Sequence, residues 1–152
     1  MIYLLDTDSV VFMVRGLKER AHPTERQRAR QKVARRIFDR AHKQKLADHE
    51  VALSAITVAE LEFGAWNSGD YETEIDATRR AITPFVLLDF DADDCAAHYG
   101  AIRHALESTG KMIGSLDTLI AAHALAIGAT LVTNNTVEFS RVTGLKCENW
   151  AS

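Results

Sequence analysis

Three acidic side chains in this 152-residue chain occur where a short apolar segment ends or where the next helix should begin. Asp6 directly follows the apolar run 2–5. Glu60 comes six residues after the run 51–54, and Asp117 lies at the start of an apolar helical segment. Ligands bind beyond the carboxyl ends of the strands in an open parallel sheet, so acids delivered there share one small volume. Packed carboxylates repel one another unless they take up protons or a cation, and oxygen ligands favour Mg²⁺ or Mn²⁺. The pattern therefore predicts a metal site suited to cutting phosphodiester bonds.

Each of these acids also has a simpler explanation at the N-terminus of a helix. Asp6 and Asp8 could cap the first helix, where Asp is favoured and where the helix dipole is positive. Glu60 stands three residues after Thr57, the spacing of a capping box, and Asp117 is expected in the first turn of its helix. Capping explains each acid singly, but it does not explain why all three fall at the same end of the predicted sheet. On the residues alone, both explanations stay open.

Strands and helices are predicted to alternate along the chain. Short apolar runs bounded by turn residues predict the strands, and apolar residues at helical spacing predict the helices. The alternation predicts an α/β protein, a single domain over residues 1–152, with right-handed crossovers. Its central sheet is expected to be mostly parallel, with four to five strands and helices on both faces. Strands are expected at 2–5, 51–54, 85–88, 130–133 and within 145–150, and helices at 10–14, 24–45, 57–65, 71–82, 91–108 and 115–127.

Positive charge is concentrated in one segment of a chain whose formal net charge is −3. Residues 15–45 contain 12 of the 18 Lys and Arg residues but only 3 of the 21 Asp and Glu residues. A long helix is expected there, opened by Thr24 with Gln27 three residues later, with one apolar face and cationic remaining faces. A basic segment joined to an acidic body indicates a nucleic-acid partner, although a well-solvated helix face explains the same composition. The residues predicted to contact RNA phosphates are Arg28, Lys32, Arg35 and Arg36.

Composition and cysteine usage predict a soluble, cytoplasmic protein that does not bind membranes. Cys95 and Cys147 lie far apart without metal-ligand spacing, which favours a reducing compartment. Asp6 and Asp8 interrupt the first apolar run and no basic region precedes it, so no signal peptide is expected. No segment approaches the roughly 20 apolar residues of a membrane span. The histidines share no spacing suited to zinc, and His123, in an otherwise apolar helix, is expected to be a packed core residue or a surface residue.

Six segments in order along the chain form a specific pattern. They are residues 4–8 (LLDTD), 54–61 (SAITVAEL), 113–124 (IGSLDTLIAAHA), 128–135 (GATLVTNN), 138–139 (EF) and 148–150 (ENW). With this pattern the chain resembles the PIN-domain ribonucleases of the VapC toxin type. The resemblance implies a three-layer sandwich in which Asp6, Glu60 and Asp117 bind Mg²⁺ or Mn²⁺. Many PIN domains add a fourth acid just after the fourth strand, and that position is expected to be Asn135 here, which brings an oxygen but no charge.

The same resemblance implies how such a protein acts. It implies a metal-dependent endoribonuclease, the toxin of a type II toxin–antitoxin pair, which inhibits translation by cutting tRNA or another structured RNA. It also implies a homodimer and a cognate antitoxin that covers the acidic groove. Two further residues are expected at the site: Asp8, whose carboxylate would lie just outside the metal ligands, and Thr7, whose hydroxyl would lie near them.

Two other functions are compatible with parts of the sequence. A haloacid-dehalogenase-like phosphatase would use Asp6 as its nucleophile and Asp8 as its acid. That function gives no role to Glu60 and needs a later acidic pair, which Asp93 and Asp94 supply poorly. A non-catalytic module would instead bind nucleic acid or protein through the basic helix, with the acids as helix caps. An Asp6→Asn variant that still cuts RNA would favour the binding module.

Overall fold

Five parallel strands form a central sheet in the computed structural model, which describes residues 1–18 and 20–152. The strands are β1 (Ile2–Leu5), β2 (Glu50–Ser54), β3 (Val86–Leu88), β4 (Thr130–Val132) and β5 (Cys147–Glu148). Their order in the sheet is β3-β2-β1-β4-β5, and each neighbouring pair is parallel. Leu4 of β1 lies opposite Ala52 of β2 on one side and opposite Leu131 of β4 on the other. Because the strands run the same way, their carboxyl ends meet at one edge of the sheet.

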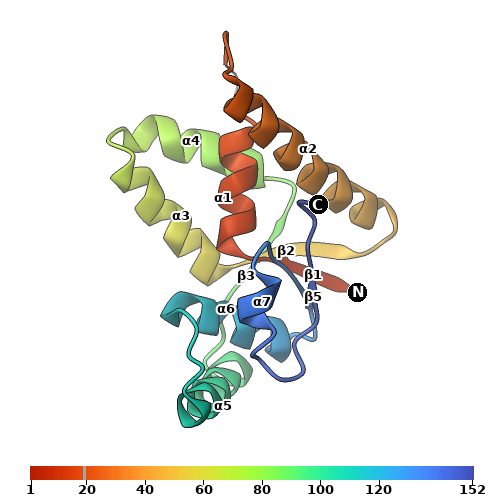
Figure 1. The fold of residues 1–152 in the computed structure, drawn as a ribbon, viewed down its shortest axis with the longest axis vertical. Coiled ribbons are helices and arrows are strands. Elements are labelled where there is room, and N and C mark those ends of the chain that lie inside the picture. Colours follow the sequence, from red (N-terminus) through yellow and green to blue (C-terminus); the bar gives the residue numbers. More distant parts are fainter. Residues whose placement is uncertain (19) are drawn as a thin grey trace.

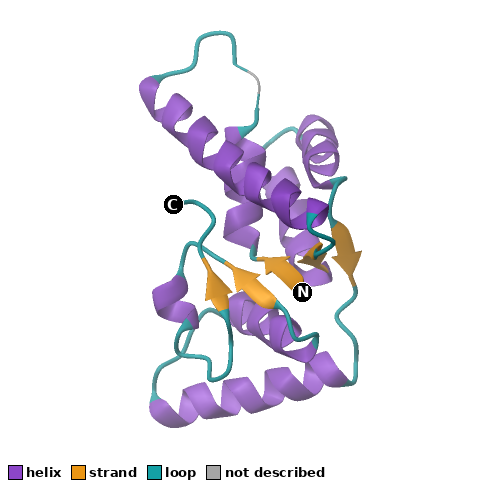
Figure 2. Ribbon diagram, turned by 90° about the vertical axis from the view of Figure 1, so that its right-hand side faces the viewer, coloured by secondary structure: helices purple, strands orange, loops and turns teal. Residues whose placement is uncertain are grey.

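Alternate strand residues point to opposite faces of the sheet, which creates two apolar layers. Leu4, Ala52 and Leu131 are fully buried in one layer. Leu5 and Leu53 are fully buried in the other. A parallel sheet is normally covered on both faces, which explains why the strands are apolar at nearly every position. Figure 2 shows the strands lying between two groups of helices.

The helices of the described residues cover both faces of the sheet (Figure 1). They are α1 (Thr7–Gly16), α2 (Glu25–Leu46), α3 (Ala55–Asn67), α4 (Tyr71–Ile82), α5 (Asp94–Thr109), α6 (Ser115–Ala126) and α7 (Thr136–Phe139). Buried residues of α1 to α4 pack in one apolar layer, and those of α5 to α7 pack in the other. The predicted α/β sandwich of three layers is therefore confirmed. Within the described part of the chain, no helix combines the length and apolar character needed to cross a membrane.

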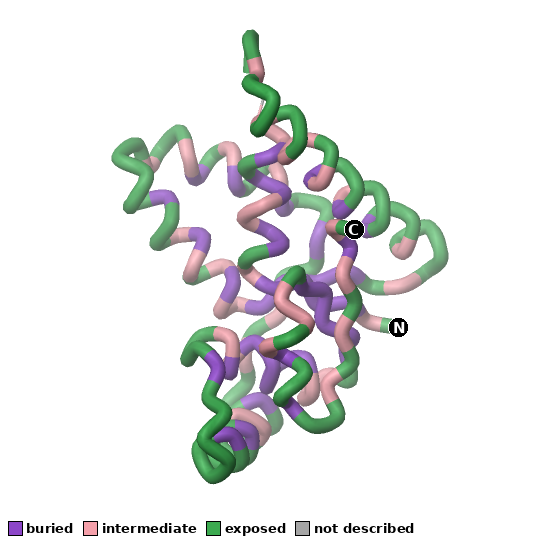
Figure 3. The backbone as a smooth tube through the Cα atoms, viewed as in Figure 1, coloured by how far each residue is buried: buried purple, intermediate pink, exposed green. Residues whose placement is uncertain are grey.

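The basic segment forms the long helix α2, and its predicted capping box is confirmed. The Gln27 amide donates to the Thr24 hydroxyl at 3.2 Å, and the Thr24 amide donates to the Gln27 side chain at 2.9 Å. α2 approaches α1 closely at Gly16, where a Cβ atom would lie 2.7 Å from the Arg30 carbonyl oxygen. A glycine is needed at this crossing because any side chain would collide with α2. Much of the remaining surface of α2 is exposed (Figure 3).

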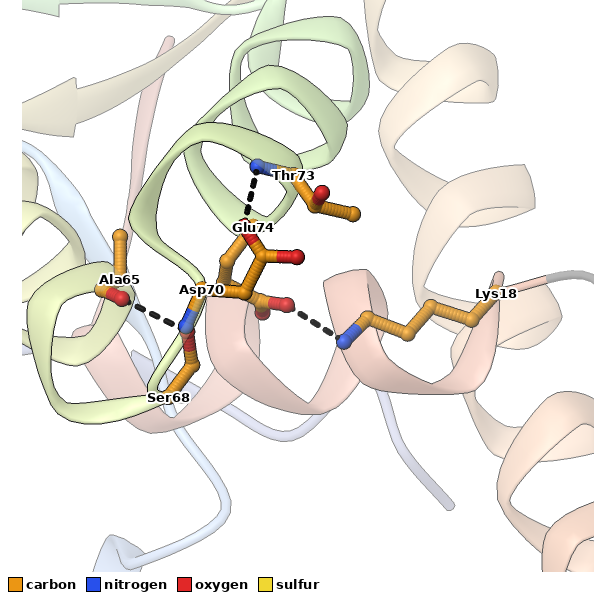
Figure 4. Close-up of polar contacts among 6 residues, drawn as sticks. All are labelled: Lys18, Ala65, Ser68, Asp70, Thr73 and Glu74. Carbon is orange, nitrogen blue, oxygen red and sulfur yellow. Dashed lines mark hydrogen bonds and ion pairs between the residues drawn. The ribbon is translucent and has the colours of Figure 1, made fainter.

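Polar contacts fix the start of α4 and join it to the end of α1 (Figure 4). Asp70 caps α4, since its Oδ1 accepts a hydrogen bond from the Thr73 amide at 3.3 Å. Lys18 Nζ lies 2.7 Å from Glu74 Oε2, and both side chains are partly buried. This ion pair links the carboxyl end of α1 to α4.

The start of α3 differs from the predicted one. Ser54 caps this helix, because its Oγ accepts from the Ile56 amide at 3.1 Å, and α3 therefore begins at Ala55. The capping box considered for Thr57 and Glu60 is wrong, which removes the simplest structural explanation for Glu60. The other predicted elements are present, with limits shifted by no more than three residues. The short helix α7 was not predicted.

Candidate active site

Asp6 directly follows β1, at the carboxyl edge of the sheet. Its side chain is 2% exposed, and its Oδ1 accepts from the Ser9 amide at 2.8 Å, so Asp6 does cap α1. Its own amide donates to the Val132 carbonyl of β4 at 2.9 Å, which fixes its backbone. Burial raises the pKa of Asp6, while hydrogen bonds from Thr133 and Ser9 oppose that rise. A serine or threonine would cap this helix without burying a charge, so capping alone does not explain an acid here.

Glu60 lies in the second turn of α3 and is oriented by two threonines. Thr7 Oγ1 donates to Glu60 Oε1 at 2.6 Å and lies 3.0 Å from the hydroxyl of the buried Thr57. A threonine hydroxyl has one proton, so Thr57 donates to Thr7 while Thr7 donates to the carboxylate. From the described part of the chain, no hydrogen bond reaches Glu60 Oε2. One oxygen of Glu60 is therefore fixed by the protein, and the other is available to a ligand.

Asp117 lies in the first turn of α6, and its pKa is raised to about 6. Burial is the largest cause, followed by the negative charges of Glu138, Asp8, Asp6 and Glu60. Contacts in the structure place these acids near one another: Thr7, between Asp6 and Asp8, donates to Glu60, and Gly114, beside the Asp117 carboxylate, donates to Glu138. The five carboxylates, here called the acidic cluster, come from α1, α3, α6, α7 and the end of β1. The structure thus brings the three predicted acids to one edge of the sheet.

Glu138 is a member of the acidic cluster that the sequence analysis missed. Glu138 Oε1 accepts from the Gly114 amide at 3.1 Å, directly before α6. Asn135, predicted at the position of the fourth acid, caps α7, and its Nδ2 donates to Glu138 Oε2 at 2.6 Å. Asn135 therefore orients an acid that supplies the charge it lacks. The three-residue spacing from Asn135 to Glu138, typical of the start of a helix, was the available signal.

The acidic cluster offers the ligands that a hard divalent cation prefers. Its side-chain donors are all carboxylate oxygens, and Mg²⁺ and Mn²⁺ take oxygen ligands. Among residues 1–18 and 20–152, no three His, Cys, Asp or Glu side chains lie close enough to form a complete metal cage. Mg²⁺ usually binds through one or two carboxylates, with water and substrate phosphates completing its octahedron. The donor set therefore fits such a cation, which would also relieve the repulsion that raises the pKa of Asp117.

The basic residues predicted to contact RNA lie together, but away from the acidic cluster. They line an open groove of about 680 Å³ between the C-terminal end of α1 and the N-terminal half of α2. α1 begins beside Asp6 and has 10 residues, which span about 15 Å. The groove therefore begins about that far from the acids. Its lining residues, none of them acidic, are Gly16, Leu17, Lys18, Arg28, Gln31, Lys32, Arg35 and Arg36; we call this the basic groove.

Fold and site together define a class of protein: a three-layer α/β sandwich with a carboxylate centre at the carboxyl edge of a parallel sheet. The sequence pattern of the PIN domain family matches residues 3–145. The chain belongs to the PIN domain family, as the resemblance in its sequence predicted.

Individual relatives are similar to this chain over nearly its whole length. Ribonuclease VapC2 of Rickettsia felis is 35% identical over 150 residues, which cover 99% of this chain and 98% of that protein. The tRNA(fMet)-specific endonuclease VapC of Salmonella typhimurium is 32% identical over 148 residues, which cover 97% of each protein. The crystal structure of VapBC2 from Rickettsia felis bound to a DNA fragment from their promoter contains a chain with a TM-score of 0.82. That chain is 32% identical, and the similarity covers 99% of both chains.

Proposed function

We propose that this protein is a metal-dependent endoribonuclease and the toxin of a toxin–antitoxin pair. The observation that carries the proposal is the convergence of five carboxylates at the carboxyl edge of the sheet. Thr7, which lies between Asp6 and Asp8, donates to Glu60, and Gly114, which lies beside the Asp117 carboxylate, donates to Glu138. Capping does not explain this convergence, whereas a bound divalent cation would offset the repulsion between the carboxylates. Membership of the PIN domain family, with relatives named as ribonucleases, supports RNA as the substrate.

The residues of the acidic cluster take different parts in the proposed reaction. A bound Mg²⁺ or Mn²⁺ would lower the pKa of a water molecule and neutralise charge on the phosphate. Asp6, fixed by Ser9, and Asp117 provide carboxylate oxygens for the cation. Glu60 has one oxygen fixed by Thr7, so its other oxygen is directed either to the cation or to the attacking water. Glu138, fixed by Gly114, adds negative charge on the side of Asp117.

The acidic cluster alone repels RNA, so substrate attraction has to come from another surface. The basic groove supplies five cationic side chains: Lys18, Arg28, Lys32, Arg35 and Arg36. Of these, Lys18 is paired with Glu74, and Arg36 donates to the Ala151 carbonyl at 3.2 Å. Such cations bind phosphates in a manner that depends on salt and tolerates sequence. We propose that the groove binds backbone phosphates a few nucleotides from the cleavage site, as a tRNA or another structured RNA would present them.

Two protein partners complete the proposal. The similar structure of VapBC2 supports a cognate antitoxin. We propose that this antitoxin covers the acidic cluster in the resting cell. A homodimer is also proposed. Both cysteines are free thiols, Cys95 buried and Cys147 partly buried, which suits the proposed cytoplasmic location.

Cleavage of a labelled total-RNA pool tests the proposed activity. Wild-type protein is incubated with Mg²⁺ or with EDTA, beside Asp6→Asn and a matched control, Asp76→Asn, which changes an exposed acid on α4. We expect discrete cuts that require Mg²⁺, are absent with Asp6→Asn and are unchanged with Asp76→Asn. Cuts that persist in EDTA or with Asp6→Asn would contradict the proposal.

The phosphatase alternative is not favoured by the structure. Asp93 and Asp94 are exposed at the start of α5, which follows β3, and β2 separates β3 from β1 in the sheet. They are therefore poorly placed to serve a reaction at Asp6. Glu60, which a phosphatase would not need, is instead oriented towards the acidic cluster by Thr7. The non-catalytic module predicts RNA binding without cuts, which the same RNA experiment detects.

A further inference from the structure

A buried hydrogen bond joins α6 to the start of α3. His123 Nδ1 lies 2.7 Å from Ser54 Oγ, and the two residues are 1% and 0% exposed. The ring of Phe90 packs edge-on to His123, with ring centroids 5.7 Å apart. Burial lowers the pKa of His123, so the ring is neutral at physiological pH.

This hydrogen bond connects the two helical layers, one of which carries Glu60 on α3 and the other Asp117 on α6. Ser54 ends β2 and shares its side of the strand with Ala52, which is buried in the layer of α5 to α7. Ser54 also caps α3, whose Leu61 is buried in the opposite layer. Glu60 follows Ser54 by six residues, and Asp117 precedes His123 by six residues. The bond therefore ties the helix that carries Asp117 to the helix that carries Glu60.

Half of the six buried residues of α6 have small side chains and lie beside the larger Ile120. Three of its buried residues are alanines, Ala121, Ala122 and Ala124. Alanine presents a small and smooth surface, so a shift of the helix by a fraction of a turn loses little interdigitation. A hydrogen bond restricts both distance and angle, and a buried partner left unpaired is unfavourable. The Ser54–His123 bond supplies the directional contact that the alanines lack.

We infer that Ser54 and His123 are positioning residues that set the separation of Glu60 and Asp117 and thereby the affinity of the acidic cluster for its divalent cation. This inference rests on the proposed metal-dependent function. Both residues are buried, so neither would contact the cation or the RNA, and each would act through the helix that it orients. Residues that orient metal ligands in this way typically change metal affinity 10–100-fold when they are removed.

The test measures Mn²⁺ binding directly, by electron paramagnetic resonance of free Mn²⁺, beside thermal unfolding of the same samples. His123→Leu fills the space without the hydrogen bond, and Ser54→Ala removes the bond from the other side. His123→Asn places an amide near the position of Nδ1 and is the conservative variant. Leu106→Ala creates a cavity on α5 in the same apolar layer, and this variant is the control for loss of stability without loss of the hydrogen bond.

We expect His123→Leu and Ser54→Ala to weaken Mn²⁺ binding at least 10-fold, while His123→Asn stays within about threefold of wild type. Leu106→Ala should lower the unfolding temperature and leave Mn²⁺ affinity unchanged. In RNA cleavage, the two disruptive variants should lower kcat at saturating RNA with little change in KM. Wild-type Mn²⁺ affinity in both disruptive variants, with only the unfolding temperature lowered, would overturn the inference. Absence of Mn²⁺ binding by the wild-type protein would instead overturn the proposed function on which the inference rests.

Discussion

The sharpest prediction concerns Asp117, whose ionised form is disfavoured by burial and by four neighbouring acids. Asp117→Asn keeps the shape of the side chain and removes its charge. A pKa raised from 3.8 to about 6 corresponds to about 3 kcal/mol without screening. Asp117 is partly exposed to solvent, which reduces this to about 1–2 kcal/mol. In EDTA at pH 7.5, the variant should therefore unfold about 3–6 °C above wild type. With Mg²⁺ present, its RNA cleavage should be abolished.

The pH dependence of this difference has a definite sign. The pKa of Asp117 is higher in the folded protein than in the unfolded chain, so its protonated form stabilises the fold. That stabilisation is fully present below about pH 4 and is lost as the pH rises through about 6. The advantage of Asp117→Asn over wild type should be smallest near pH 4, grow up to pH 6 and then level off. Taking the difference between the two proteins cancels the titration of groups that they share.

Addition of a divalent cation should make wild type more stable than Asp117→Asn. A ligand at 100 times its dissociation constant stabilises a folded protein by about 2.7 kcal/mol, so saturating Mg²⁺ should raise the unfolding temperature of wild type more than that of the variant. Differential scanning calorimetry of both proteins, from pH 4 to 8 with EDTA or Mg²⁺, measures these effects. A variant less stable than wild type in EDTA at pH 7.5 would refute the reasoning and assign Asp117 a structural role.

Three further predictions concern groups around the acidic cluster and the basic groove. Thr7→Val should lower kcat at least 10-fold, because Glu60 loses the hydrogen bond that orients its carboxylate. Thr7→Ser keeps the hydroxyl and should retain activity, and equal rates for the two variants would contradict a role of Thr7 in orienting Glu60. The double variant Lys32→Ala/Arg35→Ala should raise KM for a long RNA and reduce the slope of log K against log salt by about 1–2, measured by filter binding at several salt concentrations. An unchanged slope would exclude this groove from substrate binding. Asn135→Ala should lower stability by about 1 kcal/mol in urea unfolding, through loss of the α7 cap, and an Asn135→Ser variant, which keeps a capping oxygen without adding charge beside Glu138, should avoid much of that loss.

Local sequence patterns were sufficient to predict most of the fold. The apolar run 2–5 and its neighbours in the sheet are buried on both faces, which makes them readable as parallel strands. Thr24 and Gln27 specify the start of α2 through contacts three residues apart, so their capping box was visible in the sequence. The position of Asp6, Glu60 and Asp117 at one edge of the sheet could be predicted because each lies just after a predicted strand or in the first turn of a predicted helix.

The features that were missed depend on contacts between distant residues. Thr57 is not a cap because its hydroxyl bonds to Thr7, 50 residues away, while Ser54 competes successfully for the cap of α3. The helix α7 has four residues, too few for a recognisable period, and this concealed Glu138. The partner of His123 lies 69 residues away, so the sequence indicated only that its environment is apolar.

The central claim is that a divalent cation at the acidic cluster contacts the phosphate that is cut. Once a cleavage site is mapped, a phosphorothioate placed at that phosphate tests the claim directly, because Mg²⁺ binds sulfur poorly and Mn²⁺ accepts it better. The rate of cleavage in Mg²⁺ should fall at least 10-fold relative to the normal phosphate and should recover in Mn²⁺, with no cleavage by Asp117→Asn under either condition. Equal cleavage of both substrates in Mg²⁺, persisting in EDTA, would contradict a metal-dependent reaction at Asp6, Glu60 and Asp117.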